Sequence, residues 1–315
     1  AGRRTYDYKS TSLRWTTHQG PLGPLKIAII TFDSFYEGVR RDIEVKLNAA
    51  RTGGADGVLL DVSDNTGGLL QEAIDIAGLF LKSGLIVSVE SVDSGIKAHT
   101  DPSESEFSAP LVILTSQRTC SAAEIMTGAL QDHFRALVVG DARTCGKGTY
   151  QGMIDINDRL GTLKVTRGRF FQPSGRSNVL SGIEADIVLP SVTALQRAAM
   201  PDWRYPFAVE STYGSVVHRD AWDPGRHFTA IENQASLVSS PFRARLRARS
   251  LQRQSANSHF TKLRRKLEHA TDGRGVMSPA DYNLYFTRLK LMKINERERV
   301  KESVRVLANL ITGER

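Results

Sequence analysis

Cysteine is scarce in this sequence, and its spacing excludes the common metal sites. The 315 residues contain 2 cysteines, Cys120 and Cys145, and neither stands in a Cys-x-x-Cys or Cys/His ligand pattern. A zinc site is therefore not expected, and no cofactor is predicted. Long apolar runs are also missing. No stretch approaches about 18 uninterrupted apolar residues, which excludes a helix that spans a membrane.

Positive charge is unevenly distributed along the chain, whose net charge is +8. Residues 241–315 hold 18 Lys and Arg against 7 Asp and Glu, whereas residues 1–240 hold 24 against 27. A basic tail of this kind binds nucleic acid or anionic lipid in some proteins and is a solvated helical surface in others. In the stretch FRARLRARSLQRQ (242–254) no aromatic residue is interleaved with the arginines to stack on bases, so nucleic acid is not predicted as a partner.

Short apolar segments alternate with helical patterns over the first half of the chain. Residues 25–32 (LKIAIITF) and 56–65 (DGVLLDVSDN) indicate buried strands. Further strands are expected at 85–92, 109–116 and 135–141, and helices at 34–54, 66–84 and 121–134. This order predicts an α/β fold in which helices pack on a mostly parallel sheet.

The pattern changes after residue 149, where three β-rich segments follow at 150–156, 161–172 and 185–191. The stretch MPDWRYPF (200–207) is a predicted boundary. A loop-rich segment is expected after it, and then basic helices at 258–270 and 279–311. The chain is therefore divided into a lead-in segment (1–24), a core (25–199) and a C-terminal, mainly helical basic region (200–315).

The glycine-rich loop in ALVVGDARTCGKGT (136–149) is the first candidate for chemistry. It is similar to a phosphate-binding loop, but Gly140 and Gly146 stand one residue too far apart, and Gly148 replaces the Ser or Thr that should follow Lys147. A phosphate-binding loop must also lead into a helix, whose N-terminus binds the anion. Here the loop leads into a strand-like sequence, so a nucleotide site is not predicted.

Ser121 follows the strand at 109–116 and begins the helix at 121–134. With Glu124 three residues later it forms the pattern of a capping box. Strand, tight turn, serine and helix is also the arrangement in which hydrolases display a nucleophile. A Ser-His-Asp triad with Asp132 and His133 is excluded, because 11 or 12 helical positions place these residues about 16–18 Å from Ser121.

Lys147 is the remaining candidate for a base that activates Ser121. A neutral amine can take the proton of a serine hydroxyl, provided that burial or nearby positive charge lowers the lysine pKa from about 10.4. Lys147 lies between Gly146 and Gly148, which permit close backbone approach, and it follows a buried strand. From the residues alone, a Ser-Lys pair and a solvated surface lysine both remain open.

Four segments together resemble a known family in their order and near their spacing. They are DVSDNTGGLLQEAIDIAGLFL (61–81), TCSAAEIMTGALQDHFRALVVGD (119–141), GKGTYQ (146–151) and GIEADIVLP (182–190). On these motifs the sequence resembles the carboxy-terminal processing peptidases, which include the tail-specific proteases. The resemblance is strongest over residues 25–190. It implies a Clp-protease/crotonase-like α/β core, followed here by the basic helical region, and Ser-Lys serine endopeptidase activity.

The resemblance implies roles for individual residues. Ser121 matches the nucleophile, Lys147 the general base, and Gln151 the glutamine that holds the lysine amine in place. Gly68 and Ala122 match the positions whose backbone N–H groups form the oxyanion hole. That role agrees with the position of the Ala122 N–H at a helix N-terminus, where the helix dipole favours developing negative charge.

Other positions differ from the family or stand apart from the chemistry. Asp132 matches an aspartate tied to activity in the family, and its distance from Ser121 predicts a supporting role in the fold. One residue of the family's glycine triplet is Thr66 here. Cys120 directly precedes Ser121, and Cys145 lies in a loop that is one residue longer than in the family. The two cysteines are either small buried side chains or a pair whose oxidation blocks the site.

The resemblance also implies partners and location. Protein or peptide substrates with apolar C-terminal tails are expected, in the periplasm or cell envelope, with an adaptor protein or a second copy of the chain as a further partner. A PDZ-like module precedes the core in the family, and these residues contain none, so it lies upstream or the protein is a minimal variant. An inactive scaffold and a hydrophobic-ligand-binding module of the same fold are the alternative functions.

Overall fold

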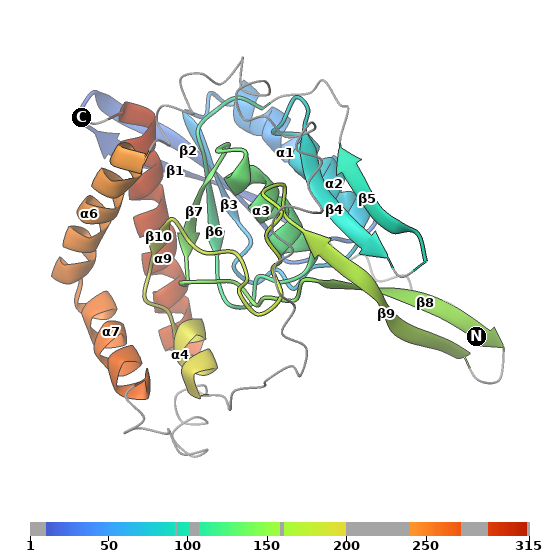
Figure 1. Cartoon of the computed structure of the whole chain (residues 1–315). Helices are drawn as coiled ribbons and strands as arrows, with labels where there is room; N and C mark the ends of the chain where they lie inside the picture. The colour runs from blue at the N-terminus through green and yellow to red at the C-terminus, as the bar shows by residue number, and fades with distance from the viewer. Residues whose placement is uncertain are drawn as a thin grey trace, which may run out of the picture.

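The structure is a computed structural model that describes residues 11–91, 93–100, 107–157, 161–199, 240–271 and 289–313. A six-stranded sheet forms its centre, in the order β1-β2-β3-β6-β7-β10. β1 (Thr11–Gly20) pairs antiparallel with β2 (Gly23–Phe32). All other neighbours are parallel, namely β3 (Gly57–Asp61), β6 (Leu111–Thr115), β7 (Leu137–Gly140) and β10 (Ile187–Val188). The predicted α/β class with a mostly parallel sheet is confirmed (Figure 1).

Alternation along the strands separates two apolar cores. In β2, Ala28 and Ile30 belong to one core, and Ile27 and Ile29 belong to the other. This follows because successive side chains of a strand point to opposite faces of the sheet. β3 and β6 are buried along their whole length, which explains their continuous apolar sequences.

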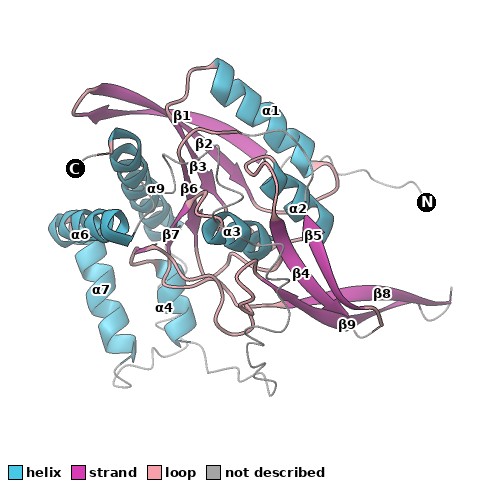
Figure 2. Cartoon of the chain, turned by 45° about the horizontal axis from the view of Figure 1, so that its top comes forward, coloured by secondary structure: helices cyan, strands magenta, loops and turns pink. Residues whose placement is uncertain are grey.

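Helices cover both faces of the main sheet, as Figures 1 and 2 show. α1 (Val39–Thr52), α2 (Leu70–Gly78) and α3 (Ala122–Asp132) pack on the first face. α6 (Ser240–Ala256) and α9 (Leu289–Thr312) pack on the second face through side chains that include Phe242, Leu246 and Leu307. The C-terminal helices therefore contribute to the core of the sheet.

A second sheet is built from antiparallel strands only. Its order is β5 (Gly95–Thr100), β4 (Leu85–Ser91), β9 (Gly161–Phe171) and β8 (Thr149–Asn157). β8 and β9 form a hairpin that projects from the body of the molecule (Figure 1). At the base of the hairpin, Phe170 is buried in the core of the first face, which anchors the hairpin beside α3.

Among its described residues, the C-terminal region contains a helix that the sequence does not predict. The helix expected at 258–270 is α7 (Ser258–Thr271), which packs with α4 (Val192–Ala199) in a small cluster of its own. A loop-rich segment is expected before it, but residues 240–256 form α6, because Arg and Leu favour helices and its buried side chains recur every four residues on one face, namely Phe242, Leu246, Ser250 and Gln254. The predicted boundary at 200–207 lies outside the described residues. No described helix has the length and apolar character needed to cross a membrane.

Leu307→Ala tests the packing of α9 on the sheet. The Leu307 side chain is 0% exposed, and a Cβ on Gly57 would lie 3.1 Å from Leu307 Cδ1. Removing this side chain leaves a cavity, so we expect the free energy of unfolding of the intact chain to fall by about 2–5 kcal/mol in urea denaturation. Ile294→Ala, on the same helix but 41% exposed, is the control and should change stability by less than about 1 kcal/mol. Equal effects of the two substitutions would contradict the packing.

Candidate active site

The site is built from segments that follow three adjacent parallel strands. β3 leads to the pair Gly67-Gly68, β6 leads to Ser121, and β7 leads to Lys147. These strands are neighbours in the main sheet. Because the carboxyl ends of parallel strands lie at the same edge of a sheet, the order of the strands brings together residues that are distant in sequence.

Ser121 is held in a strained backbone conformation at the N-terminus of α3. Its φ is 58° and its ψ is −118°, values that are rare for a residue other than glycine and unlike the extended geometry of an ordinary helix cap. Gly67 packs directly against it, since a Cβ on Gly67 would lie 2.7 Å from Ser121 Cβ. Strain at the start of a helix that follows a strand is typical of a displayed nucleophile.

Lys147 lies on the loop between β7 and β8, with a glycine on either side. Gly146 has a φ of 79° and Gly148 a φ of 60°, left-handed values that glycine adopts without strain. The loop is fixed on both sides of the lysine, because the Leu180 N–H donates to Gly146 O and the Phe170 N–H donates to Gly148 O. The lysine side chain therefore starts from a defined backbone.

Lys147 Nζ lies 3.4 Å from Ser121 Oγ, within hydrogen-bond distance. Burial lowers the pKa of Lys147, the positive charge of Lys164 lowers it further, and the Glu124 carboxylate opposes both effects. A lower pKa increases the fraction of neutral amine, which is the only form that can accept a proton from the serine hydroxyl. The sequence left a Ser-Lys pair and a solvated lysine open, and the structure brings the two side chains together.

One buried carboxylate binds both halves of this pair. Glu124, on the first turn of α3, is 0% exposed. Its Oε2 accepts the N–H of Ser121 at 2.9 Å and that of Lys147 at 3.1 Å. Its Oε1 accepts the Gly146 N–H at 2.8 Å and the Thr144 hydroxyl at 2.5 Å. Burial raises the pKa of Glu124, and these hydrogen bonds offset part of that rise.

The backbone N–H groups of Gly68 and Ala122, which lie beside Ser121, have no acceptor among the described residues. The Phe35 N–H donates to Gly67 O, and the Leu69 N–H donates to Phe35 O. Because these groups face Phe35, the N–H of Gly68 between them points to the other side. The Ala122 N–H belongs to the first turn of α3, whose N–H groups have no partner inside the helix.

A pocket of about 450 Å³ opens over this arrangement. Ser121, Lys147, Gly68 and Ala122 all contribute to its lining. Much of the remaining wall is apolar and is formed by Leu69, Leu70, Val89, Ile125 and Phe170. The pocket therefore combines a serine, a lysine and two N–H groups with a surface suited to apolar groups.

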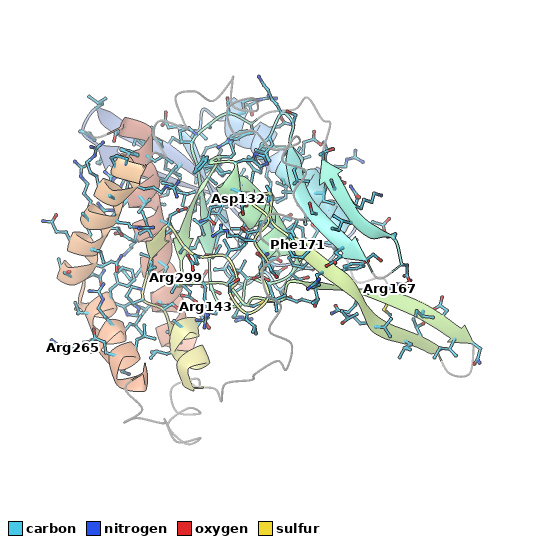
Figure 3. All side chains as sticks on the ribbon, viewed as in Figure 1. Asp132, Arg143, Arg167, Phe171, Arg265 and Arg299 are labelled. Atoms are coloured by element: carbon cyan, nitrogen blue, oxygen red, sulfur yellow. A yellow bond between two sulfur atoms is a disulfide. The ribbon has the colours of Figure 1, made fainter. Side chains whose placement is uncertain are left out.

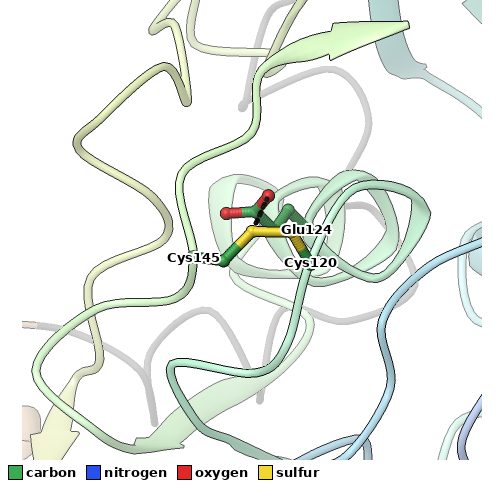
Figure 4. A group of neighbouring side chains, drawn as sticks. All are labelled: Cys120, Glu124 and Cys145. Carbon is green, nitrogen blue, oxygen red and sulfur yellow. Dashed lines mark hydrogen bonds between the residues drawn. A yellow bond between two sulfur atoms is a disulfide. The ribbon is translucent and has the colours of Figure 1, made fainter. Parts of the chain in front are cut away.

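Cys120 and Cys145 are joined by a disulfide beside the pair (Figure 4). Their Cα atoms are 5.2 Å apart, so of the two interpretations of the cysteines the structure supports a pair that meets.

The sulfurs of Cys120 and Cys145 and a Glu124 carboxylate oxygen lie within 4.8 Å of one another, as in a metal site. However, the sulfurs are bonded to each other and each Glu124 oxygen already accepts two hydrogen bonds, so this group fits a metal ion poorly.

Comparison with known proteins identifies the family. The family model described as peptidase family S41 matches residues 26–189. The chain belongs to peptidase family S41. The tail-specific protease of Haemophilus influenzae is 32% identical to it over 174 residues, which are 53% of this chain and 25% of that protein. The carboxyl-terminal-processing protease of Synechocystis sp. is 33% identical over 193 residues, which are 61% of this chain and 45% of that protein.

A solved structure shares the fold of this S41 chain. The photosystem II D1 C-terminal processing protease matches it with a TM-score of 0.53 and 24% sequence identity, over 59% of this chain and 50% of that one. The family model confirms the family predicted from the sequence motifs, and the structural match confirms the α/β fold. The chain spans less than half the length of the two curated relatives, at 25% and 45%.

Gln151 lies in the same pocket as Ser121 and Lys147, whereas Asp132 lies away from them. Gln151 on β8 lines the same pocket as Lys147, but among the described residues no hydrogen bond joins the two side chains. The register of β8 against β9 shifts between Tyr150 and Gln151, which changes the direction of the side chain. Asp132 lies at the opposite end of α3 (Figure 3), where it accepts the Ser174 N–H at 2.9 Å and binds Arg176 at 3.1 Å.

Sequence reasoning missed two residues of the site. Glu124 was assigned only to a capping box, although it is the single acidic residue within the apolar stretch AAEIMTGAL (122–130). An acid in such a stretch must find buried partners, and this signal points to a structural carboxylate. Lys164 gave no signal, because it reaches the pocket only through the pairing of β9 with β8, where it lies opposite Met153.

Glu124→Gln tests the carboxylate that joins the two halves of the site. In Glu124→Gln an NH₂ group replaces one of the two carboxylate oxygens. This group cannot accept a backbone N–H, so at least one of the four buried hydrogen bonds is lost. We expect the free energy of unfolding to fall by about 1–3 kcal/mol in urea denaturation. Glu44→Gln is the matched control, because Glu44 is paired with Arg40 on the surface of α1, and its effect should stay below about 1 kcal/mol. If Glu124→Gln left the free energy of unfolding unchanged, the role of Glu124 as a buried acceptor of four hydrogen bonds would be contradicted.

Lys164→Gln tests the electrostatic influence on Lys147. Removing this positive charge removes one cause of the lowered pKa, so the pKa of Lys147 should rise toward 10.5. The measurement is an NMR titration of the protein carrying ¹³C-labelled lysine, with Lys147→Gln used to assign the resonance. Lys262→Gln, which removes a lysine from α7, is the control and should leave the titration unchanged. An unchanged Lys147 pKa in Lys164→Gln would contradict the coupling.

Proposed function

We propose that this S41 chain carries the catalytic core of a serine endopeptidase of the tail-specific, C-terminal processing type. The observation that carries the proposal is the contact of Lys147 Nζ with Ser121 Oγ at 3.4 Å, made by a lysine whose pKa is lowered by burial. In this proposal Ser121 is the nucleophile and Lys147 is the general base. No metal or cofactor takes part in the proposed chemistry.

The first half of the reaction forms an acyl-enzyme. Neutral Lys147 accepts the hydroxyl proton of Ser121 while Oγ bonds to the carbonyl carbon of the scissile peptide. The N–H groups of Gly68 and Ala122 donate to the oxyanion, and the N-terminus of α3 adds its favourable potential. The carbon–nitrogen bond then breaks, and the Lys147 ammonium gives its proton to the leaving amine.

The second half repeats these steps with water. Lys147 takes a proton from a water molecule, whose oxygen attacks the acyl carbon, and the same two N–H groups hold the oxyanion. The bond to Ser121 Oγ breaks, Oγ receives the proton from Lys147, and the carboxylic acid product leaves. Gln151 holds the Lys147 amine when substrate is bound, a role supported by its position in the lining of the same pocket.

The proposed substrates are proteins or peptides with apolar C-terminal tails. The apolar wall beside Ser121, which includes Leu69, Ile125 and Phe170, supports an apolar segment next to the scissile bond. The proposed location is the periplasm or cell envelope. The Cys120–Cys145 disulfide supports it, because such bonds persist in oxidising compartments and are rare in the cytosol.

Substitutions at Ser121 and Lys147 test the reaction. Ser121→Ala removes the nucleophile and should abolish hydrolysis of an unstructured protein with an apolar tail, and with it labelling by a fluorophosphonate probe. Lys147→Ala should lower kcat/KM by about 10²–10⁴-fold, the contribution of a general base. Lys147→Arg should be no better, because a guanidinium stays charged.

The controls are Ser255→Ala on α6 and Lys262→Ala on α7, which lie outside the pocket lining and should keep the wild-type rate. Hydrolysis at the wild-type rate by Lys147→Ala would overturn the mechanism. A wild-type chain that neither hydrolyses protein nor reacts with the probe would favour the inactive scaffold of the same fold.

A further inference from the structure

The disulfide has a specific place in the site. Cys120 directly precedes Ser121, and Cys145 lies two positions before Lys147. The bond joins residues 25 positions apart in sequence, and it connects the turn after β6 to the loop after β7. It is therefore a covalent link between the segment that carries the serine and the segment that carries the lysine.

Both segments contain backbone conformations that lie outside the regular geometry of a helix or a strand. Ser121 has a φ of 58°, and the lysine loop depends on Gly146 and Gly148 with φ values of 79° and 60°. Such conformations persist only when surrounding contacts determine them. Besides the disulfide, four kinds of contact link the two segments among the described residues. They are the Cys145 N–H bond to Thr119 O, the Gln117 N–H bond to Asp141 Oδ2, the Lys147–Ser121 side-chain contact and the hydrogen bonds to Glu124.

We propose that the Cys120–Cys145 disulfide is a positioning element of the Ser121–Lys147 pair, so that the oxidised chain is the competent form and reduction impairs catalysis. This inference rests on the proposed peptidase function. It reverses the expectation that oxidation blocks the site, because Lys147 Nζ lies 3.4 Å from Ser121 Oγ while the disulfide is formed.

Reduction also changes the bonding of Glu124. Cys145 Sγ lies 3.4 Å from Glu124 Oε2, the oxygen that accepts the N–H groups of Ser121 and Lys147 (dashed line in Figure 4). A disulfide sulfur carries no hydrogen and cannot donate across this contact. A free Cys145 thiol can donate, and it then competes with the two N–H groups for the oxygen that joins the pair.

The reduction itself is ordinary thiol–disulfide exchange with a dithiol. One dithiol sulfur attacks a protein sulfur, the protein S–S bond breaks, and a mixed disulfide forms. The second dithiol sulfur then displaces the protein sulfur, which leaves a cyclic disulfide and two protein thiols. Two electrons and two protons pass from the dithiol to the cysteines. Cys120 and Cys145 are both partly exposed, so the reagent can reach the bond.

The experiment uses the intact chain, in which these are the only 2 cysteines. Hydrolysis of an unstructured protein with an apolar tail is measured before and after dithiothreitol, with thiol titration to count free cysteines and far-UV circular dichroism to monitor folding. We expect kcat to fall by roughly 10²-fold on reduction, the effect of misplacing a reacting group by about 1 Å, with KM little changed. Reoxidation should restore the rate.

The matched variant is Cys120→Ala/Cys145→Ala, which should have the low kcat of the reduced chain and no response to dithiothreitol. A pH profile separates positioning from a general loss of structure. Lys164 and Glu124 are the charged groups that influence Lys147. When the lysine leaves its partly buried position, its pKa rises, so the acidic limb of kcat/KM should move to higher pH in the reduced chain and in the variant.

Two results would overturn the inference, and they can be told apart. If the oxidised chain hydrolyses protein and labels with a fluorophosphonate, and the reduced chain does so at the same rate and with the same pH profile, only the role of the disulfide fails. If the oxidised chain neither hydrolyses nor labels, the proposed peptidase function fails, and the role of the disulfide fails with it.

Discussion

The site depends on the buried carboxylate of Glu124. This group accepts hydrogen bonds from the backbone of Ser121 and of Lys147, and from Gly146 and Thr144 on the same loop as the lysine. A carboxylate without water must have partners, and these donors are the partners that it has. The same hydrogen bonds that satisfy the buried carboxylate therefore hold the backbone of Ser121 and the backbone of Lys147 beside each other.

The order of strands in the main sheet allows the Glu124 side chain to reach both segments. β3, β6 and β7 are parallel neighbours, so the chain leaves all three at the same edge. Glycine is required where the segment after β3 approaches the segment after β6, since a Cβ on Gly67 would lie 2.7 Å from Ser121 Cβ. Helices on both faces hold the strands in place, and α9 from the end of the chain completes the second face.

Much of the fold was predictable because its signals are local. The apolar runs at 25–32 and 109–116 form β2 and β6, and the periodic segments at 34–54 and 121–134 contain α1 and α3. α6 was not predicted, because its many arginines hide the few apolar side chains that pack on the sheet. The contacts of Glu124 were not predictable either, since three of its four partners lie on the loop after β7, 20 to 23 residues further along the chain.

The sequence alone determined the α/β class, the S41 family and the candidates Ser121 and Lys147, because strand periodicity, turn glycines and short motifs are properties of neighbouring residues. Only the tertiary structure decided that the serine and the lysine meet, that Glu124 joins them, and that Cys120 and Cys145 form a bond beside them. These contacts depend on which strands lie side by side, and no local pattern specifies that order.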